Sequence, residues 1–135
     1  MDDDQHFITT ARWVSACPIT SLEQREPFLL EVDEDNQIAV IKVNEDYYAI
    51  RNSCPHTGGP LHMGDIEDFP TPCNEEGEEK PAIVCPWHAW TFFLHNGLQV
   101  DVPQEEGGEK IETFETKLKD GHIMVKVTTK KAVDF

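Results

Sequence analysis

Two short segments of the sequence each place a cysteine close to a histidine, in stretches that contain proline. The first reads Cys54-x-His56 and the second reads Cys85-x-x-His88, with residues 57–84 between them. Thiolate sulfur and imidazole nitrogen are both ligands for soft and borderline metal ions. Each segment offers one of each, so the pair predicts a four-ligand metal site. A chain that builds such a site must fold so that two loops distant in sequence come together.

The ligand set by itself leaves two kinds of metal site open, tetrahedral zinc and an iron–sulfur cluster. Zinc fingers usually pair cysteine with cysteine and histidine with histidine. Here each segment is mixed. A mixed segment fits a binuclear centre in which each loop gives its cysteine to one iron and its histidine to the other.

Short apolar or alternating runs, separated by acidic, glycine- and proline-containing stretches, predict β-strands throughout the chain. Residues 38–43 are almost all apolar, which is typical of a strand buried on both faces. Asp120-Gly121 is a strong hairpin signal, and Ile123, Val125 and Val127 after it share one face. The expected strands are 12–15, 28–32, 38–43, 47–50, 82–84, 90–94, 98–100, 116–118 and 123–127.

These elements together predict an all-β fold, an antiparallel barrel or sandwich. No stretch has the pattern of an amphipathic helix, although residues 21–24 are compatible with a single helical turn. Residues 65–80 contain several acids and two prolines, so we expect an acidic loop with a mobile tip there.

Length and charge narrow the class of protein. The chain has 135 residues, which predicts one domain over 1–135. It carries 11 basic and 26 acidic residues, a net charge of −15, which argues against nucleic acid and against an anionic membrane as partners. The N-terminus has neither a secretory nor a transit-peptide pattern, and 82–94 is too short to span a bilayer. We therefore expect a cytoplasmic protein.

The two segments and their surroundings resemble the Rieske [2Fe–2S] ferredoxin family. The likeness covers about residues 28–127, and residues 58–69 look particularly like the small soluble Rieske-domain proteins of animals. Besides the two Cys/His patterns, the matching features are 47–50, Gly58, Gly59, Pro86, Trp87, 90–92 and Gly97.

This resemblance implies one [2Fe–2S] cluster per chain, with Cys54, His56, Cys85 and His88 as its ligands. It implies an antiparallel β-sandwich or barrel with a small cluster-binding subdomain inserted at about 52–95. It also implies that the two histidines lie at the tip of the protein and provide the route for the electron.

The function that the resemblance implies is single-electron transfer without substrate chemistry. A Rieske oxygenase needs a second, mononuclear iron domain, and this chain has no length for one. The implied partners are a flavin- or NAD(P)H-dependent reductase as donor and an oxygenase or other redox enzyme as acceptor. We expect a monomer whose negative charge speeds docking to a basic partner.

Three other functions remain open at this stage. Small Rieske-like chains also occur as subunits of assimilatory reductases such as nitrite reductase. The chain is also compatible with a cluster-dependent redox sensor that binds different partners with and without its cluster. The fourth possibility is a protein with a structural zinc ion.

Two departures from the family pattern carry information. High-potential members have an additional cysteine in each loop, joined as a disulfide, and Gly59 and Trp87 stand at those positions here. This chain therefore resembles the low-potential, ferredoxin-like branch, for which we expect a potential of about −150 mV. The interval between the two segments is also long for that branch, with a surplus at about 70–80.

The remaining cysteines, histidines and aromatic residues receive structural interpretations. We expect Cys17 to be buried and Cys73 to be a loop thiol. Gly58 and Gly59 would let backbone N–H groups approach the cluster sulfides, with ordinary turn geometry as the alternative. Trp87 either packs or shields the site. We expect Trp90 and Phe92 in the core, and His6, His62, His95 and His122 at the surface.

Overall fold

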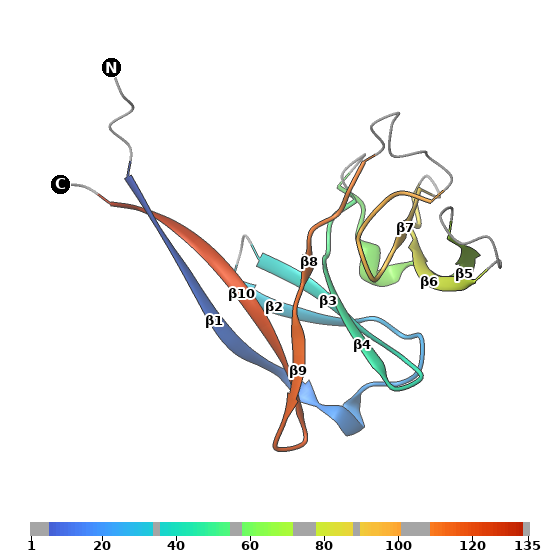
Figure 1. Cartoon of the computed structure of the whole chain (residues 1–135), viewed down its shortest axis with the longest axis horizontal. Coiled ribbons are helices and arrows are strands. Elements are labelled where there is room, and N and C mark those ends of the chain that lie inside the picture. The colour runs from blue at the N-terminus through green and yellow to red at the C-terminus, as the bar shows by residue number, and fades with distance from the viewer. Residues whose placement is uncertain are drawn as a thin grey trace.

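Three antiparallel sheets make up the protein in the computed structural model, which describes residues 6–33, 36–54, 58–71, 78–87, 90–100 and 109–133 (Figure 1). The ribbon sheet has the order β1 (His6–Pro18), β10 (His122–Val133), β9 (Thr116–Lys119). The central sheet has the order β2 (Phe28–Asp33), β3 (Asn36–Val43), β4 (Asp46–Arg51), β8 (Thr113–Phe114). The small sheet has the order β5 (Asp65–Pro70), β6 (Glu79–Val84), β7 (Thr91–Phe93).

Two short 3-10 turns, η1 (Ile19–Ser21) and η2 (Leu61–Met63), are the helical elements of the described ranges. The prediction of an all-β antiparallel fold is confirmed. No helix in this part of the chain is long and apolar enough to cross a membrane.

Strand β3 lies between the two main apolar clusters of the protein. Ile38 and Val40 belong to the cluster that the ribbon sheet covers, together with Val125. Ala39 and Ile41, which alternate with them, belong to the cluster on the other face, beneath the small sheet. Because successive side chains of a strand point to opposite faces, a strand between two cores must be apolar at every position. The prediction that 38–43 is buried on both faces is therefore confirmed.

The β9–β10 hairpin forms where Asp120-Gly121 predicts it. Both turn residues have positive φ, 51° for Asp120 and 77° for Gly121, as a two-residue type I′ turn requires. Ile123, Val125 and Val127 follow on one face of β10 and are fully buried against the central sheet. The turn and the alternation of apolar residues thus agree on the same register.

Strand β1 is much longer than the expected 12–15. It pairs with β10 from His6↔Val133 to Pro18↔His122, with one irregularity between Ser15 and Cys17. Few apolar residues alternate in the first half of β1, so its strand character comes from hydrogen bonds to β10. Figure 1 shows this half running out with β10 beyond the central sheet. Cys17 is buried as predicted, and burial raises the pKa of its thiol.

Four details of the expected element order are wrong. Residues 65–70 and 79–80 are not loop but strands β5 and β6, since Ile66 turns inward while its acidic neighbours remain exposed. The expected tip of that loop, 72–77, lies outside the described residues. Residues 98–100 form only isolated bridges, and strand β8 was not expected. The single helical turn lies at η1, ahead of 21–24.

Truncation of Ile123 should test the contact between the ribbon sheet and the central sheet. Ile123 is fully buried, so Ile123→Ala should lower the free energy of unfolding by about 2–5 kcal/mol through lost burial and a residual cavity. Leu118, its cross-strand neighbour on β9, is 54% exposed. Leu118→Ala should therefore change it by about 0.5 kcal/mol or less. Urea unfolding measures both, and equal losses would contradict the burial pattern.

Candidate metal centre

Both cysteines of the predicted metal site are buried in the apolar cluster beneath the small sheet. Cys54 follows β4 by three residues, and Cys85 comes directly after β6. Their exposed fractions are only 2% and 1%. The two predicted histidine ligands, His56 and His88, lie outside the described residues, as does Cys73.

Gly59 is the point at which the two segments meet. Its carbonyl accepts a hydrogen bond from the Cys54 N–H at 3.0 Å, and the Gly58 N–H donates to the Cys54 carbonyl at 2.7 Å. A Cβ atom at Gly59 would lie 2.9 Å from the Cys85 Sγ. Since real Cβ atoms do not approach sulfur this closely, only glycine allows the first loop to rest on the second cysteine. The structure thus brings the two sulfur-bearing segments together around one residue.

Trp87 lies beside the same glycine. Two of its ring atoms would be 3.3 Å from a Cβ at Gly59, yet 58% of the residue remains exposed. Trp87 therefore covers the loop junction from outside and is not a core residue. Because neither Gly59 nor Trp87 carries sulfur, no disulfide joins these adjacent positions, and Cys17, Cys54 and Cys85 carry thiols.

The second loop begins at Cys85 and ends at the start of strand β7. The Cys85 N–H donates to the Trp90 carbonyl at 2.7 Å, which links the two ends of the loop. The Trp90 ring lies 6.5 Å from that of Phe92, which is fully buried. Trp90 itself is half-buried, and both rings belong to the core as predicted.

Strand β5, which the sequence did not predict, presses the first segment against the second. Asp65 pairs with Val84, the residue before Cys85. A Cβ at Gly64 would overlap the Val84 carbonyl oxygen, so the chain needs glycine here as well. The β5–β6 hairpin therefore does more than connect the two segments, since it positions the end of β6 beside the first loop.

Asn52 and His62 close the first loop at its base, and neither was predicted to do so. Asn52 is the one buried polar side chain in the described part of the chain. Its Oδ1 accepts from the His62 backbone N–H at 2.6 Å, and its Nδ2 lies 2.9 Å from the His62 Nδ1. An amide nitrogen can only donate, so Nδ1 accepts and the ring proton is on Nε2. His62 is half-buried, so it lies partly exposed and not fully at the surface.

These groups fit a cofactor held by thiolate ligands. Both cysteines are buried in one apolar cluster of side chains. The backbone of Gly59 lies so close to the Cys85 sulfur that only glycine fits there. Soft thiolate donors select iron–sulfur clusters or zinc. The profile of the Rieske [2Fe–2S] domain family matches residues 12–117, which is most of the chain. This protein belongs to the Rieske [2Fe–2S] domain family.

Known proteins similar to this Rieske domain include both short and longer chains. A human Rieske domain-containing protein is 39% identical over 66 residues, 49% of this chain and 37% of the human protein. This chain thus matches little more than a third of that relative's length. The 3-phenylpropionate/cinnamic acid dioxygenase ferredoxin subunit of Shigella flexneri is 26% identical over 112 residues, covering 83% of this chain and 91% of the subunit.

A solved structure supports the fold independently. A protein described as an NADH-dependent nitrite reductase small subunit from Mycobacterium tuberculosis superposes with a TM-score of 0.70 at 18% identity. The superposition covers 87% of this chain and 96% of the other. Membership of the Rieske family identifies the cofactor as a [2Fe–2S] cluster.

Arg25 fastens the small sheet of this Rieske domain to its base. Its guanidinium donates to both carboxylate oxygens of Asp68, at 3.0 and 2.9 Å, and to the Ile66 carbonyl at 3.4 Å. Its backbone N–H donates to the Lys42 carbonyl at 2.8 Å. Arg25 has a φ of 62°, which is uncommon for a residue with a side chain and is held here by these contacts.

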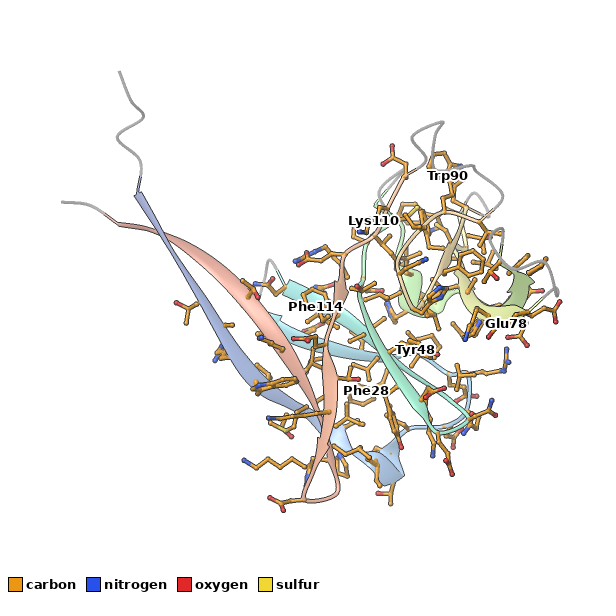
Figure 2. All side chains as sticks on the ribbon, in the orientation of Figure 1. Phe28, Tyr48, Glu78, Trp90, Lys110 and Phe114 are labelled. Carbon is orange, nitrogen blue, oxygen red and sulfur yellow. The ribbon has the colours of Figure 1, made fainter. Side chains whose placement is uncertain are left out.

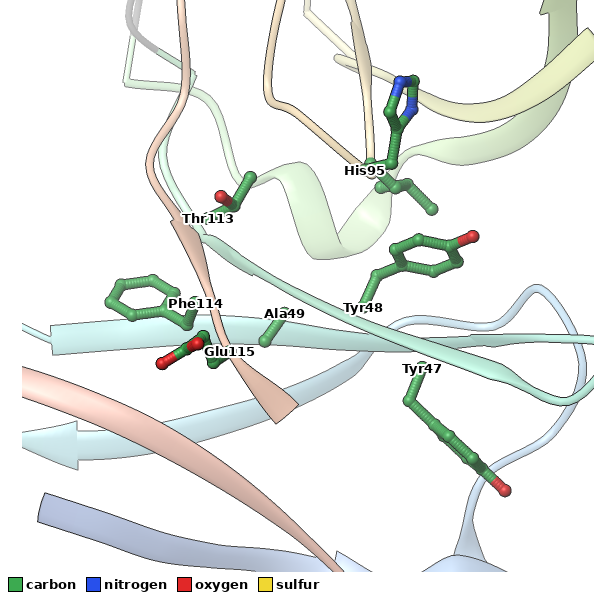
Figure 3. A pocket seen from close by; sticks show the side chains of 8 residues that line it. Tyr47, Tyr48, Ala49, His95, Thr113, Phe114 and Glu115 are labelled. Carbon is green, nitrogen blue, oxygen red and sulfur yellow. The ribbon is translucent and has the colours of Figure 1, made fainter. Parts of the chain in front are cut away.

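A shallow groove of about 290 Å³ lies between the central and small sheets, away from the cysteines. In Figure 3, Ala49 lies in the middle of the groove. Tyr48 and His95 lie on one side of it, and Phe114 lies on the other side. Burial and then Asp46 raise the pKa of Tyr48, whereas burial and then Lys80 lower the pKa of His95. Both shifts favour uncharged side chains.

Of the other histidines predicted at the surface, His95 and His122 are exposed, and the side chain of His6 is not described.

Replacement of Gly59 should disturb the site without a change of charge. In Gly59→Ala the new methyl group would meet the Cys85 sulfur, so we expect a large loss of bound iron and sulfide per chain. Gly58→Ala is the control, since nothing lies within 4 Å of its Cβ position and only its φ of +75° is strained. Metal and sulfide analysis of both purified variants distinguishes them. A Gly59→Ala protein with full cluster content would contradict the close contact.

Loss of the Asn52 amide should loosen the base of the first loop. Asn52→Ala leaves the His62 N–H and ring nitrogen without this partner, which should cost about 1–3 kcal/mol of stability. Asn36→Ala is the control, because Asn36 bonds exposed Asp33 and the bond that it accepts from Arg51 is long, at 3.4 Å. Thermal unfolding and the rate of cluster loss are the measurements. The idea fails if Asn36→Ala is as harmful as Asn52→Ala.

Proposed function

We propose that this chain is a Rieske-type ferredoxin that carries single electrons from a reductase to an oxygenase or another redox enzyme. Its cluster would be held by Cys54 and Cys85 on one iron and by His56 and His88 on the other, one cluster per chain. The observation that carries this proposal is the contact of both buried cysteine segments with Gly59, in a chain of the Rieske family. When bound, the cluster supplies reversible one-electron chemistry.

The surroundings of the cysteines suit a carrier. Burial of both sulfurs to a few per cent keeps water from the thiolate ligands, and the hydrogen bonds to Gly59 and Trp90 hold the two loops in place. A rigid ligand shell reduces the structural change that accompanies electron gain or loss. The two histidines follow their cysteines by two and three residues, so we place them on the same loops, at the end facing a partner.

The similarity to a dioxygenase ferredoxin subunit favours a carrier. We propose one domain over 1–135, with residues of about 52–95 as the cluster-binding subdomain that includes the small sheet. The dioxygenase ferredoxin subunit covers nearly the same length as this chain, and its name describes a partner of an oxygenase. By analogy, the donor here would be a flavin- or NAD(P)H-dependent reductase. We place the protein in a reducing compartment such as the cytoplasm, because Cys17, which is not a proposed ligand, is a thiol.

The second candidate is a small electron-transfer subunit of a larger reductase. The superposition on a nitrite reductase small subunit favours it, because the two chains share almost their full lengths. The two functions differ in assembly. A chain that is monomeric and active when mixed with separate partners supports the carrier, whereas a chain that purifies only with a large partner supports the subunit.

A visible and EPR spectrum of the dithionite-reduced protein tests the cluster assignment. We expect a brown protein with iron and sulfide in equal amounts and a low average g value. His88→Ala should abolish the native spectrum, because one iron would lose an imidazole ligand. Cys73→Ser is the control and should keep it. A His88→Ala protein with an unchanged spectrum would show that His88 is not a ligand.

The midpoint potential tests the resemblance to the low-potential branch. Gly59 and Trp87 are neighbours, and neither residue is a cysteine. No disulfide can therefore join the two ligand loops at these positions. We expect a midpoint of about −150 mV by protein-film voltammetry. A value above zero would place the protein with the high-potential members instead.

A further inference from the structure

The ribbon sheet differs in charge from the rest of the molecule. Residues 6–18 and 116–133, which form it, contain six of the 11 basic residues and one of the 26 acidic residues. This part therefore has a formal charge of +5, and the remainder has −20. The net charge of −15 is thus the sum of a positive ribbon sheet and a strongly negative remainder.

Three of the lysines, Lys117, Lys119 and Lys126, share the outer face of this sheet with a tryptophan, whereas Arg12 pairs with Val127 and lies on the other face. Trp13 pairs with Lys126, and Met124 pairs with Lys117, so these four residues lie on the face opposite the buried Val125. The Lys117 Nζ lies 4.2 Å from the centre of the Trp13 ring. Trp13 is 37% exposed. We call this group, together with Lys119, the Trp13 face.

The charges of the Trp13 face are only partly neutralised within the molecule. Lys126 lies 3.3 Å from an oxygen of Glu115, an exposed pair that contributes little. Among the described residues, Lys117 and Lys119 have no carboxylate within ion-pair distance. By contrast, Arg25, Arg51 and Lys80 elsewhere each contact an acid. The face thus retains positive charge that is available to an outside partner.

We propose that the Trp13 face docks a narrow acidic segment of a partner protein, with carboxylates on the lysines and an apolar group on Trp13. Charge complementarity selects an acidic partner, and the half-exposed tryptophan provides an anchor of the kind common at interfaces. A narrow segment fits better than an anionic bilayer. A bilayer extends past the face on every side and would meet the exposed acids Glu115 and Asp120.

The position of this face separates it from the candidate metal centre. The apolar cluster that contains Val125 lies between the ribbon and central sheets, whereas Cys54 and Cys85 belong to the apolar cluster on the other face of β3. Packed sheets are about 10 Å apart, and charges are screened over about 8 Å at physiological salt. An acidic segment on the Trp13 face is therefore screened from most of the negative remainder. Docking here leaves the cysteine loops open to a redox partner.

This charge arrangement predicts an unusual salt dependence. At about 10 mM salt the screening length is about 30 Å, so the repulsion from the whole molecule reaches the Trp13 face. At about 1 M salt the attraction to the lysines is itself screened. Binding of an acidic segment should therefore be strongest at intermediate salt. If only the net negative charge of the protein mattered, an acidic segment would not bind at any salt concentration.

The test is a titration of a fluorescent glutamate decapeptide with the full-length, cluster-loaded protein, followed by anisotropy across this salt range. We expect a binding maximum at intermediate salt and a shift of the Trp13 indole N–H resonance. Lys117→Glu and Lys119→Glu should each weaken binding by roughly threefold or more. Lys110→Glu is the control with the same net charge. Lys110 lies outside the ribbon sheet, where it forms an isolated bridge with Leu98 (Figure 2), and its replacement should leave binding unchanged.

Several outcomes would overturn the proposal. These are no binding at any salt, an equal loss in Lys110→Glu, or resonance shifts away from Trp13. Association with phosphatidylserine vesicles through Lys117 and Lys119, without peptide binding, would replace the protein segment by a lipid surface. Circular dichroism melting curves show whether the variants are folded, and both lysines are exposed, so a folding defect is not expected.

Discussion

The close approach of Gly59 to the Cys85 sulfur is the constraint on which the site depends. Gly59 belongs to the loop of Cys54, and its backbone lies directly against the sulfur of Cys85. Any side chain at Gly59 would separate them. The surrounding structure serves this contact: β6 ends at the second cysteine, and η2 and β5 hold the first loop against it.

The elements that hold the loops in place are mostly polar or backbone contacts. Asn52 bonds His62 across the base of the first loop, and Arg25 clamps Asp68 on the small sheet. Apolar burial supplies a common platform beneath them, with Ile41 of β3 in the same cluster as the two cysteines. Burial of apolar side chains brings the sheets together but is not directional. Hydrogen bonds are directional, so they define the geometry of the loops.

Charge distribution adds a second organising feature. The net charge describes the whole molecule at long range, but at physiological salt a partner feels only the charges within about one screening length. The positive Trp13 face and the acidic remainder therefore act as separate surfaces. On the carrier function that we propose, two such surfaces would let the protein hold one partner while it exchanges electrons with another.

The sequence by itself determined the all-β fold, the β9–β10 turn, the double-sided burial of β3 and the family, because periodicity, Asp120-Gly121 and the Cys/His spacing are local properties. It did not predict β5, whose acids resemble those of a loop, or the roles of Asn52, His62 and Gly64. Those depend on residues distant in sequence. Only tertiary structure decided them, because the partner of a hydrogen bond or the atom that excludes a Cβ is known only once the chain has folded.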